Sequence, residues 1–128
     1  QTQLGVRPGI KSAVSQRDST LYLFEEAESM ATFITTIKFT QQGLKGMQET
    51  THRASALKAA AKKMGVKVTG IYWALGDHDG VLIYESPDDE TASTMLLYLG
   101  SLGNVHTSTV RAFNSSEMDG ILKRAYPA

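Results

Sequence analysis

The stretch GIYWALGDHDGVLIYES, residues 70–86, predicts a β-hairpin around which the rest of the chain can be placed. Two runs rich in β-branched and aromatic residues, Ile71–Leu75 and Val81–Tyr84, flank the turn-forming segment Gly76–Gly80. Asp and Gly accept the backbone angles that a tight chain reversal needs. We therefore expect two neighbouring antiparallel strands, the first of them extending over Val66–Leu75.

Upstream of the hairpin, the sequence predicts a strand and then a helix. In Ala31–Phe39 alternate residues form one apolar face, and the other face is mixed and rich in threonine. The following segment contains two glycines and reads as a loop or a frayed helical turn. From Glu49 or Thr50 to Met64, apolar residues recur at helical spacing in a narrow stripe. Gly65 then stands where a left-handed helix cap is expected.

Downstream of the hairpin, Ser86 and Pro87 begin a second helix signal. Serine is a favourable N-cap, proline suits the first helical position, and the two aspartates that follow favour the first turn. The helix is expected to run to about Leu102. Its inward residues are predicted to be Ala92, Leu96, Leu99 and Leu102.

A last strand and a last helix follow. The strand is predicted from Asn104 or Val105 to Phe113. The segment Asn114–Glu117 has the spacing of a capping box, which predicts a terminal helix over about Ser115–Arg124.

The predicted order is β-α-β-β-α-β followed by a helix, which is a ferredoxin-like α+β fold. Right-handed crossovers place both main helices on one face of a four-stranded antiparallel sheet with strand order 4-1-3-2. The other face stays bare in a single chain, and we expect it to carry Ile34 and either Ile71 or Trp73. Packing two such faces together would bury them, so the sequence predicts a homodimer or higher homo-oligomer, a dimeric α/β barrel.

The composition fits one domain with a segment of different character before it. Thirteen basic residues balance thirteen acidic ones in 128 residues, so no net field favours nucleic acid or an anionic membrane. The chain has no cysteine, which excludes disulfides and thiolate chemistry and leads us to expect a cytoplasmic location. No apolar run approaches the roughly 20 residues of a membrane span. Residues 1–29 are expected to be an N-terminal arm or a leader, and residues 30–128 the domain.

Several segments resemble the GYD-domain proteins of the dimeric α/β-barrel superfamily in order and spacing. They are MATFITTIKFTQQGLKGM, KKMGVKV, GIYWALGDHD and LGSLGNVHTSTVRAF, and the resemblance covers about residues 30–124. The motif that names the family corresponds to Gly76-x-x-Asp79, with His78 in place of the usual tyrosine. The resemblance implies a ferredoxin-like subunit that dimerises through its sheet. It implies no particular reaction, because one fold supports many functions.

Two groups of side chains are candidates for a site. His78 and Asp79 either form an acid/base pair at the mouth of the barrel or belong to a solvated turn. Tyr72, Trp73 and Tyr84 either line an apolar cavity for a planar hydrophobic molecule or serve as core and interface residues. Since Tyr72 and Trp73 are neighbours in a strand, we expect one on each face of the sheet.

No metal or other cofactor is predicted. The three histidines, His52, His78 and His106, show no spacing that supplies adjacent ligands, and the topology puts His78 at the opposite end of the sheet from the other two. Arg53, in the opening turn of the first helix, is the one candidate for holding an anion.

Two functions of different class are compatible with these residues. The first is a small homo-oligomeric protein whose immediate property is assembly, or binding of a small hydrophobic ligand. The second is a cofactor-independent monooxygenase or isomerase acting on a small molecule inside the barrel. The enzyme hypothesis requires at least two of Trp73, Tyr84, His78 and Asp79 to meet at one cavity. Binding of nucleic acid through the basic face of the first helix has the least support.

Overall fold

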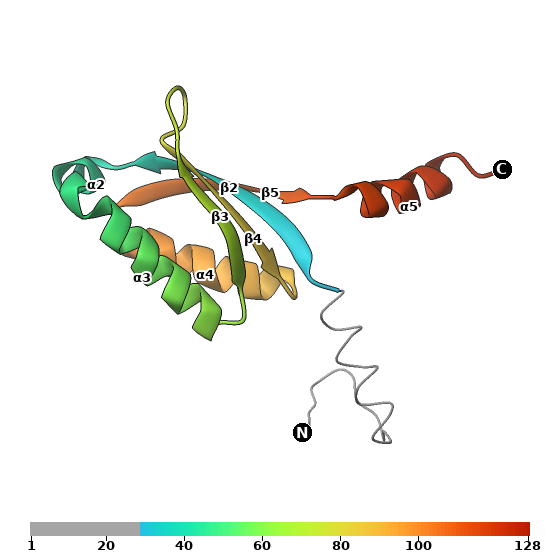
Figure 1. Cartoon of the computed structure of the whole chain (residues 1–128), viewed down its shortest axis with the longest axis horizontal. Coiled ribbons are helices and arrows are strands. Elements are labelled where there is room, and N and C mark those ends of the chain that lie inside the picture. Colours follow the sequence, from blue (N-terminus) through green and yellow to red (C-terminus); the bar gives the residue numbers. More distant parts are fainter. Residues whose placement is uncertain (1–28) are drawn as a thin grey trace, which may run out of the picture. The chain divides into compact units, whose positions relative to one another are not determined.

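The computed structural model describes residues 29–128, so the arm or leader expected over residues 1–29 lies almost entirely outside the described part (Figure 1). Residues 31–128 form one unit. Its elements are β2 (Ala31–Phe39), α2 (Gln41–Lys45), the 3-10 turn η1 (Met47–Glu49), α3 (Thr50–Lys63), β3 (Lys67–Trp73), β4 (Gly80–Ser86), α4 (Asp89–Ser101), β5 (Val105–Ala112) and α5 (Ser115–Ala125). This order confirms the predicted β-α-β-β-α-β pattern with a terminal helix. The segment after β2, expected to be a loop or a frayed helical turn, forms the short helix α2 and η1.

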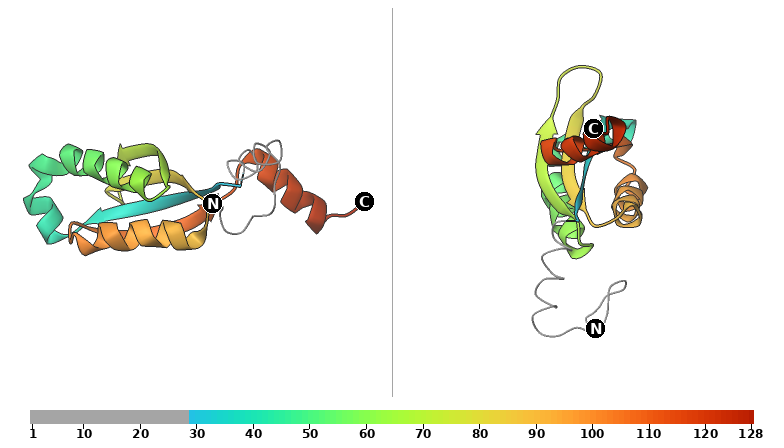
Figure 2. Two further views of the ribbon diagram at one scale, coloured as in Figure 1. Left: turned by 90° about the horizontal axis from the view of Figure 1, so that it is seen from below. Right: turned by 90° about the vertical axis from the view of Figure 1, so that its right-hand side faces the viewer.

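The sheet has four antiparallel strands in the order β3-β4-β2-β5, which is the predicted order read from the other edge. The central strand β2 pairs with β4 and β5, and β3 pairs with β4 to complete the hairpin. Both crossovers carry their helices to the same side. Figure 2, left, looks onto this layer and shows α3 and α4 side by side, with β2 visible between them.

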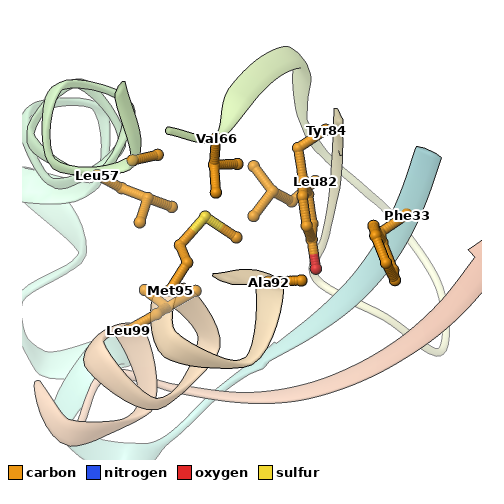
Figure 3. Close-up of a cluster of buried hydrophobic side chains, with 9 residues drawn as sticks. Phe33, Leu57, Val66, Leu82, Tyr84, Ala92, Met95 and Leu99 are labelled. Atoms are coloured by element: carbon orange, nitrogen blue, oxygen red, sulfur yellow. The ribbon is translucent and has the colours of Figure 1, made fainter. Parts of the chain in front are cut away.

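The core lies between the sheet and this helical layer. α3 packs on β3, and α4 packs on β4 and β5. Figure 3 shows side chains from strands and helices pointing into the same space. The buried cluster consists of Phe33, Leu57, Ala61, Val66, Leu82, Tyr84, Ala92, Met95 and Leu99.

The register decides which side chains lie on the open face, the face of the sheet away from the helices. Ile71 pairs with the buried Leu82, and Trp73 with Gly80, so both lie on the helical side. The expectation that Ile71 or Trp73 lies on the open face is therefore wrong. Tyr72 is on the open face, which confirms that the two neighbouring aromatic residues of β3 point to opposite faces. The large apolar residues of the open face are Ile34, Tyr72, Val81, Ile83 and Val110.

The second main helix begins later than predicted. Its N-cap is Asp88, whose carboxylate accepts a hydrogen bond from the Thr91 amide at 2.7 Å. Ser86 is the last residue of β4, is buried, and its hydroxyl donates to the Asp88 carbonyl at 2.9 Å. Met95, which was not among the predicted inward residues, belongs to the core. Leu102, which was predicted to point inward, is 47% exposed.

Other local predictions are confirmed. Gly65 has a φ of 88°, the left-handed conformation expected after α3. Asn114 and Glu117 form a complete capping box at the start of α5. Within the described residues, no helix has the length and apolar character needed to cross a membrane.

Candidate functional site

An apolar pocket of about 130 Å³ lies between the sheet, α3 and α4. Its residues come from both helices and from all four strands, so the folded domain is needed to form it. The lining consists of Ile37, Phe39, Thr50, Arg53, Ala54, Ala56, Leu57, Ile71, Tyr72, Trp73, Gly80, Leu82, Tyr98, Leu99, Leu102, Asn104 and Val105.

The floor of the pocket is aliphatic because the strands are aligned there. Ile71 and Leu82 are direct partners across the β3–β4 ladder, and Ile37 of β2 pairs with Gly80. Gly80 is buried, and a Cβ added there would lie 3.0 Å from the Tyr72 carbonyl oxygen and 3.7 Å from the Ile37 Cβ. Glycine at this position therefore lets the strands approach and leaves the floor flat.

Trp73 connects the sheet to the start of α3 at the pocket. Its indole Nε1 donates to the Thr50 Oγ1 at 3.0 Å, and the residue is 47% exposed. An indole with its polar atom bonded and its ring partly free is suited to contact an apolar molecule. The sequence named Trp73 as a candidate ligand residue, and the structure places it at this pocket.

Arg53 is the charged residue among those that line the pocket. Its guanidinium Nη2 donates to the Gly46 carbonyl at 2.7 Å and to the Gly43 carbonyl at 3.1 Å. Both carbonyls lie at the end of α2, and that of Gly46 also accepts a hydrogen bond from the Glu49 amide at 2.9 Å. Arg53 thus holds α2 beside the pocket. Both bonds are made by Nη2 of the Arg53 guanidinium, the group that the sequence analysis named as a candidate for holding an anion.

The segment containing α2 is also fixed to the loop before β5. The Thr40 amide donates to the Asn104 carbonyl at 3.0 Å, and the Gln42 Nε2 donates to the Asn104 Oδ1 at 3.0 Å. A Cβ added to Gly43 would lie only 2.1 Å from the Asn104 carbonyl oxygen, so the close approach requires glycine. These contacts fix the end of the pocket at which Asn104 lies.

The two candidate catalytic residues lie in the turn of the hairpin. The Asp79 Oδ2 accepts a hydrogen bond from the Phe39 amide at 2.9 Å, and the Asp79 amide donates to the Ile37 carbonyl at 2.8 Å. The carboxylate therefore continues the β2–β4 ladder by one bond beyond the last strand pair. His78 is exposed in the turn, and neither residue lines the pocket.

The other two aromatic candidates lie elsewhere. Tyr84 is fully buried, its ring stacks on Phe33 at a centroid distance of 5.7 Å, and its hydroxyl is 2.9 Å from the Thr35 Oγ1 (Figure 3). Tyr72 borders the pocket, but its side chain is on the open face. There its ring covers Gly70, where an added Cβ would lie 2.9 Å from the ring. Tyr84 lies on the helical side of the sheet but does not line the pocket, so of the three aromatic candidates Trp73 alone directs its side chain to the pocket.

Sequence reasoning missed the part of the lining contributed by the helices. Ala54 and Leu57 of α3 and Tyr98 and Leu99 of α4 face the pocket. Ala54 and Leu57 belong to the apolar stripe of the first predicted helix, and Leu99 was expected to point inward, but an inward residue of a helix usually fills the core. The described residues contain no group of three histidine or acidic side chains placed to hold a metal ion.

The four-stranded sheet, the helices on one face and the pocket between them define a ferredoxin-like α+β domain. The family model of the GYD domain matches residues 33–122, and the chain belongs to this family. The match begins in β2 and ends in α5, so it includes every element around the pocket. A comparison with curated proteins found no match.

Proposed function

We propose that this chain binds a small apolar molecule in the pocket between α3, α4 and the sheet. The observation that supports this function most directly is the lining: most of the lining residues are aliphatic or aromatic, and the charged one, Arg53, is bonded to backbone carbonyls. An apolar cavity of roughly 150 Å³ in a protein stays dry and admits a benzene-sized molecule. A pocket of about 130 Å³ thus suits a ligand with one ring.

Binding is better supported than catalysis. An acid/base mechanism needs a titrating group within hydrogen-bond reach of the reacting atom. Asp79 uses its carboxylate to hold the Phe39 amide, and Tyr84 uses its hydroxyl in the core. The enzyme hypothesis needs at least two of Trp73, Tyr84, His78 and Asp79 at one cavity, and of these Trp73 alone lines the pocket. A cofactor-independent monooxygenase or isomerase remains the alternative function.

The single tryptophan of the chain makes the proposal testable. Iodobenzene, a one-ring quencher with a heavy atom, is titrated against the fluorescence of Trp73. We expect saturable quenching in the unchanged protein. The variant Ala54→Leu adds bulk inside the pocket and should weaken binding roughly tenfold or more, because a filled cavity excludes the ring. The matched control is Ala59→Leu, which adds the same group at an exposed position of the same helix.

Equal saturable quenching in the Ala54→Leu variant would show that iodobenzene binds elsewhere. Linear quenching without saturation in the unchanged protein would contradict the proposal itself. The thermal midpoints of both variants are recorded in parallel, so that a loss of folding is not mistaken for a loss of binding.

The proposed binding protein acts as a homodimer joined through the open face. The support is the apolar row on that face, where Tyr72 is 60% exposed and Val110 is 58% exposed. Exposed apolar surface of this kind marks a contact site. Family membership agrees with this arrangement, since the resemblance implied dimerisation through the sheet. The cytoplasmic location stays a prediction, and cell fractionation would test it.

A further inference from the structure

The terminal helix α5 carries an apolar stripe that its own domain leaves uncovered. Met118, Ile121, Leu122 and Ala125 recur at the spacing of one helix face. None of the side chains of α5 is buried, and the helix has no extensive contact with another described element. Figures 1 and 2 show it leaving the end of β5 and pointing away from the sheet.

The start of α5 is nevertheless held firmly. Asn114 and Glu117 close the capping box with bonds of 2.8 and 2.9 Å. The Arg111 guanidinium lies 4.5 Å from the centroid of the Phe113 ring, and its Nη2 is 3.3 Å from the Glu117 Oε2. The direction in which α5 leaves β5 is thus set by side chains of the strand and of the first helical turn.

A helix of this length needs a partner surface. Isolated helices shorter than roughly 12–15 residues are marginal in water, and a central glycine costs about 1 kcal/mol more than alanine. α5 has eleven residues and contains Gly120. Packing of an amphipathic face is the usual source of the missing stability.

We infer that the apolar stripe of α5 packs on the open sheet face of a second copy of this chain, and that the two copies exchange their α5 helices reciprocally. The inference rests on the proposed homodimer and names the element that completes it. In a two-fold symmetric pair, one contact of this type implies a second, identical one. Each exchange covers both an unpartnered helix and an unpartnered sheet face.

The area that a stable dimer needs favours this occupant. A standard interface removes roughly 800 Å² from each partner. On the open face, Tyr72 and Val110 are well exposed, whereas the other three apolar residues are already partly covered. An aromatic side chain supplies at most roughly 150–250 Å², so the two well-exposed apolar side chains of the sheet alone supply well under this area. The exposed residues of the terminal segment, Met118, Leu122 and Tyr126, add further apolar surface to that of the sheet.

The two surfaces are also continuous. Val110 and Ala112 of β5 pair with Ile34 and Thr32, and so stand on the open face. α5 begins three residues after Ala112. The apolar surface of the sheet therefore leads along its edge strand directly into the helix. One contact with a second copy covers this whole stretch.

The absence of cysteine allows a direct test by site-specific cross-linking. One copy carries Leu122→Cys and one affinity tag, and the other copy carries Ile34→Cys, Ile83→Cys or Val110→Cys and a different tag. A short bis-maleimide is added to the mixed, full-length proteins. We expect a product containing both tags with at least one of the three sheet positions. The matched control, Lys123→Cys, lies on the opposite side of α5 and should give several-fold less product.

A second measurement covers the case in which cross-linking geometry is poor. The double variant Met118→Asp/Leu122→Asp changes exposed residues, so the monomer should fold normally. Its dimer dissociation constant should rise roughly tenfold or more, as for loss of central apolar contacts. An unchanged dissociation constant, with no product containing both tags, overturns the exchange and leaves the sheet dimer intact. A monomer at every concentration removes the dimer and the exchange together.

Discussion

Asp79 is the residue of the hairpin whose role the structure defines most clearly. Its carboxylate accepts the Phe39 amide and so replaces a strand partner where the β2–β4 ladder ends. The aspartate of the family's naming motif therefore has a structural task in this chain. His78, beside it, is exposed and makes none of the bonds that hold the turn to β2.

Replacing Asp79 should therefore weaken folding more than replacing His78. We expect Asp79→Ala to lower the free energy of unfolding by about 1–3 kcal/mol, because it leaves the Phe39 amide without its acceptor. Asp79→Asn retains an acceptor oxygen and should cost less. The measurement is urea unfolding monitored by circular dichroism. His78→Ala is the control, expected within about 0.5 kcal/mol of the unchanged chain, and a larger loss for His78→Ala would contradict this assignment.

The turn itself was predictable from local residue types, but the role of Asp79 was not. Gly and Asp at the reversal indicate a turn whatever lies nearby. The partner of the carboxylate, Phe39, stands forty residues earlier in the chain, as the hydrogen bond between them records. The candidate site residues were predictable to the same extent. Alternation along the strand placed Tyr72 and Trp73 on opposite faces of the sheet. Only the pairing of this strand with Gly80 and Leu82 determined that Trp73 is the one on the helical face.

At the scale of the elements, the start of α4 shows how two good caps compete. Ser86 and Asp88 both have side chains suited to an N-cap. Strand β4 extends to Ser86 and buries it, so the helix starts two residues later, at the next capping side chain. Sequence patterns locate the helix well, but they do not determine where the preceding strand ends, because pairing with β2 decides this.

Removal of this cap should be measurable and should depend on pH. Hydrogen bonds from the Thr91 hydroxyl and then from its amide hold the pKa of Asp88 below its usual value of 3.8. A lowered pKa means that the carboxylate stabilises the folded state above the usual value and loses this effect as the pH falls below it. We expect Asp88→Ala to cost about 1 kcal/mol in the free energy of unfolding at pH 7.

The control for the cap is Asp88→Asn, which keeps an acceptor oxygen but has no carboxylate to titrate. It should retain most of the stability at pH 7. As the pH falls below about 3.8, its stability should decrease less than that of the unchanged chain, because asparagine has no carboxylate to become protonated. Urea unfolding of the three proteins between pH 7 and pH 3 measures both effects. Parallel pH profiles for all three would contradict a stabilising charge at this position.

At the scale of the whole molecule, the fold followed from the order of elements and the crossover rule. The four strands, the two covering helices and α5 could each be predicted because their periodicity or caps are local. The pocket could not be predicted in the same way. It exists because Ala54, Tyr98 and Trp73, from three elements, leave a space between α3 and α4. Such a gap depends on the distance between two helices, which no local pattern determines.

The open face provides the last prediction, which concerns assembly and not the pocket. Val110→Lys places a charge at an exposed position of this face, so the monomer should keep its stability. In a symmetric dimer, the two new charges would be buried near each other or left unpaired, which costs several kcal/mol. We expect the unchanged chain to sediment as a dimer and Val110→Lys to remain a monomer at the same concentration.

The control is Leu97→Lys, which alters a residue that is 75% exposed on α4, away from the buried side of that helix. Both variants lose one exposed aliphatic side chain and gain one positive charge, so they differ in the face that they change. Sedimentation velocity over a range of concentrations separates the outcomes. If Leu97→Lys dissociates the dimer and Val110→Lys does not, the copies meet through the helical layer. The open face would then be free, and the exchange of α5 would lose its surface.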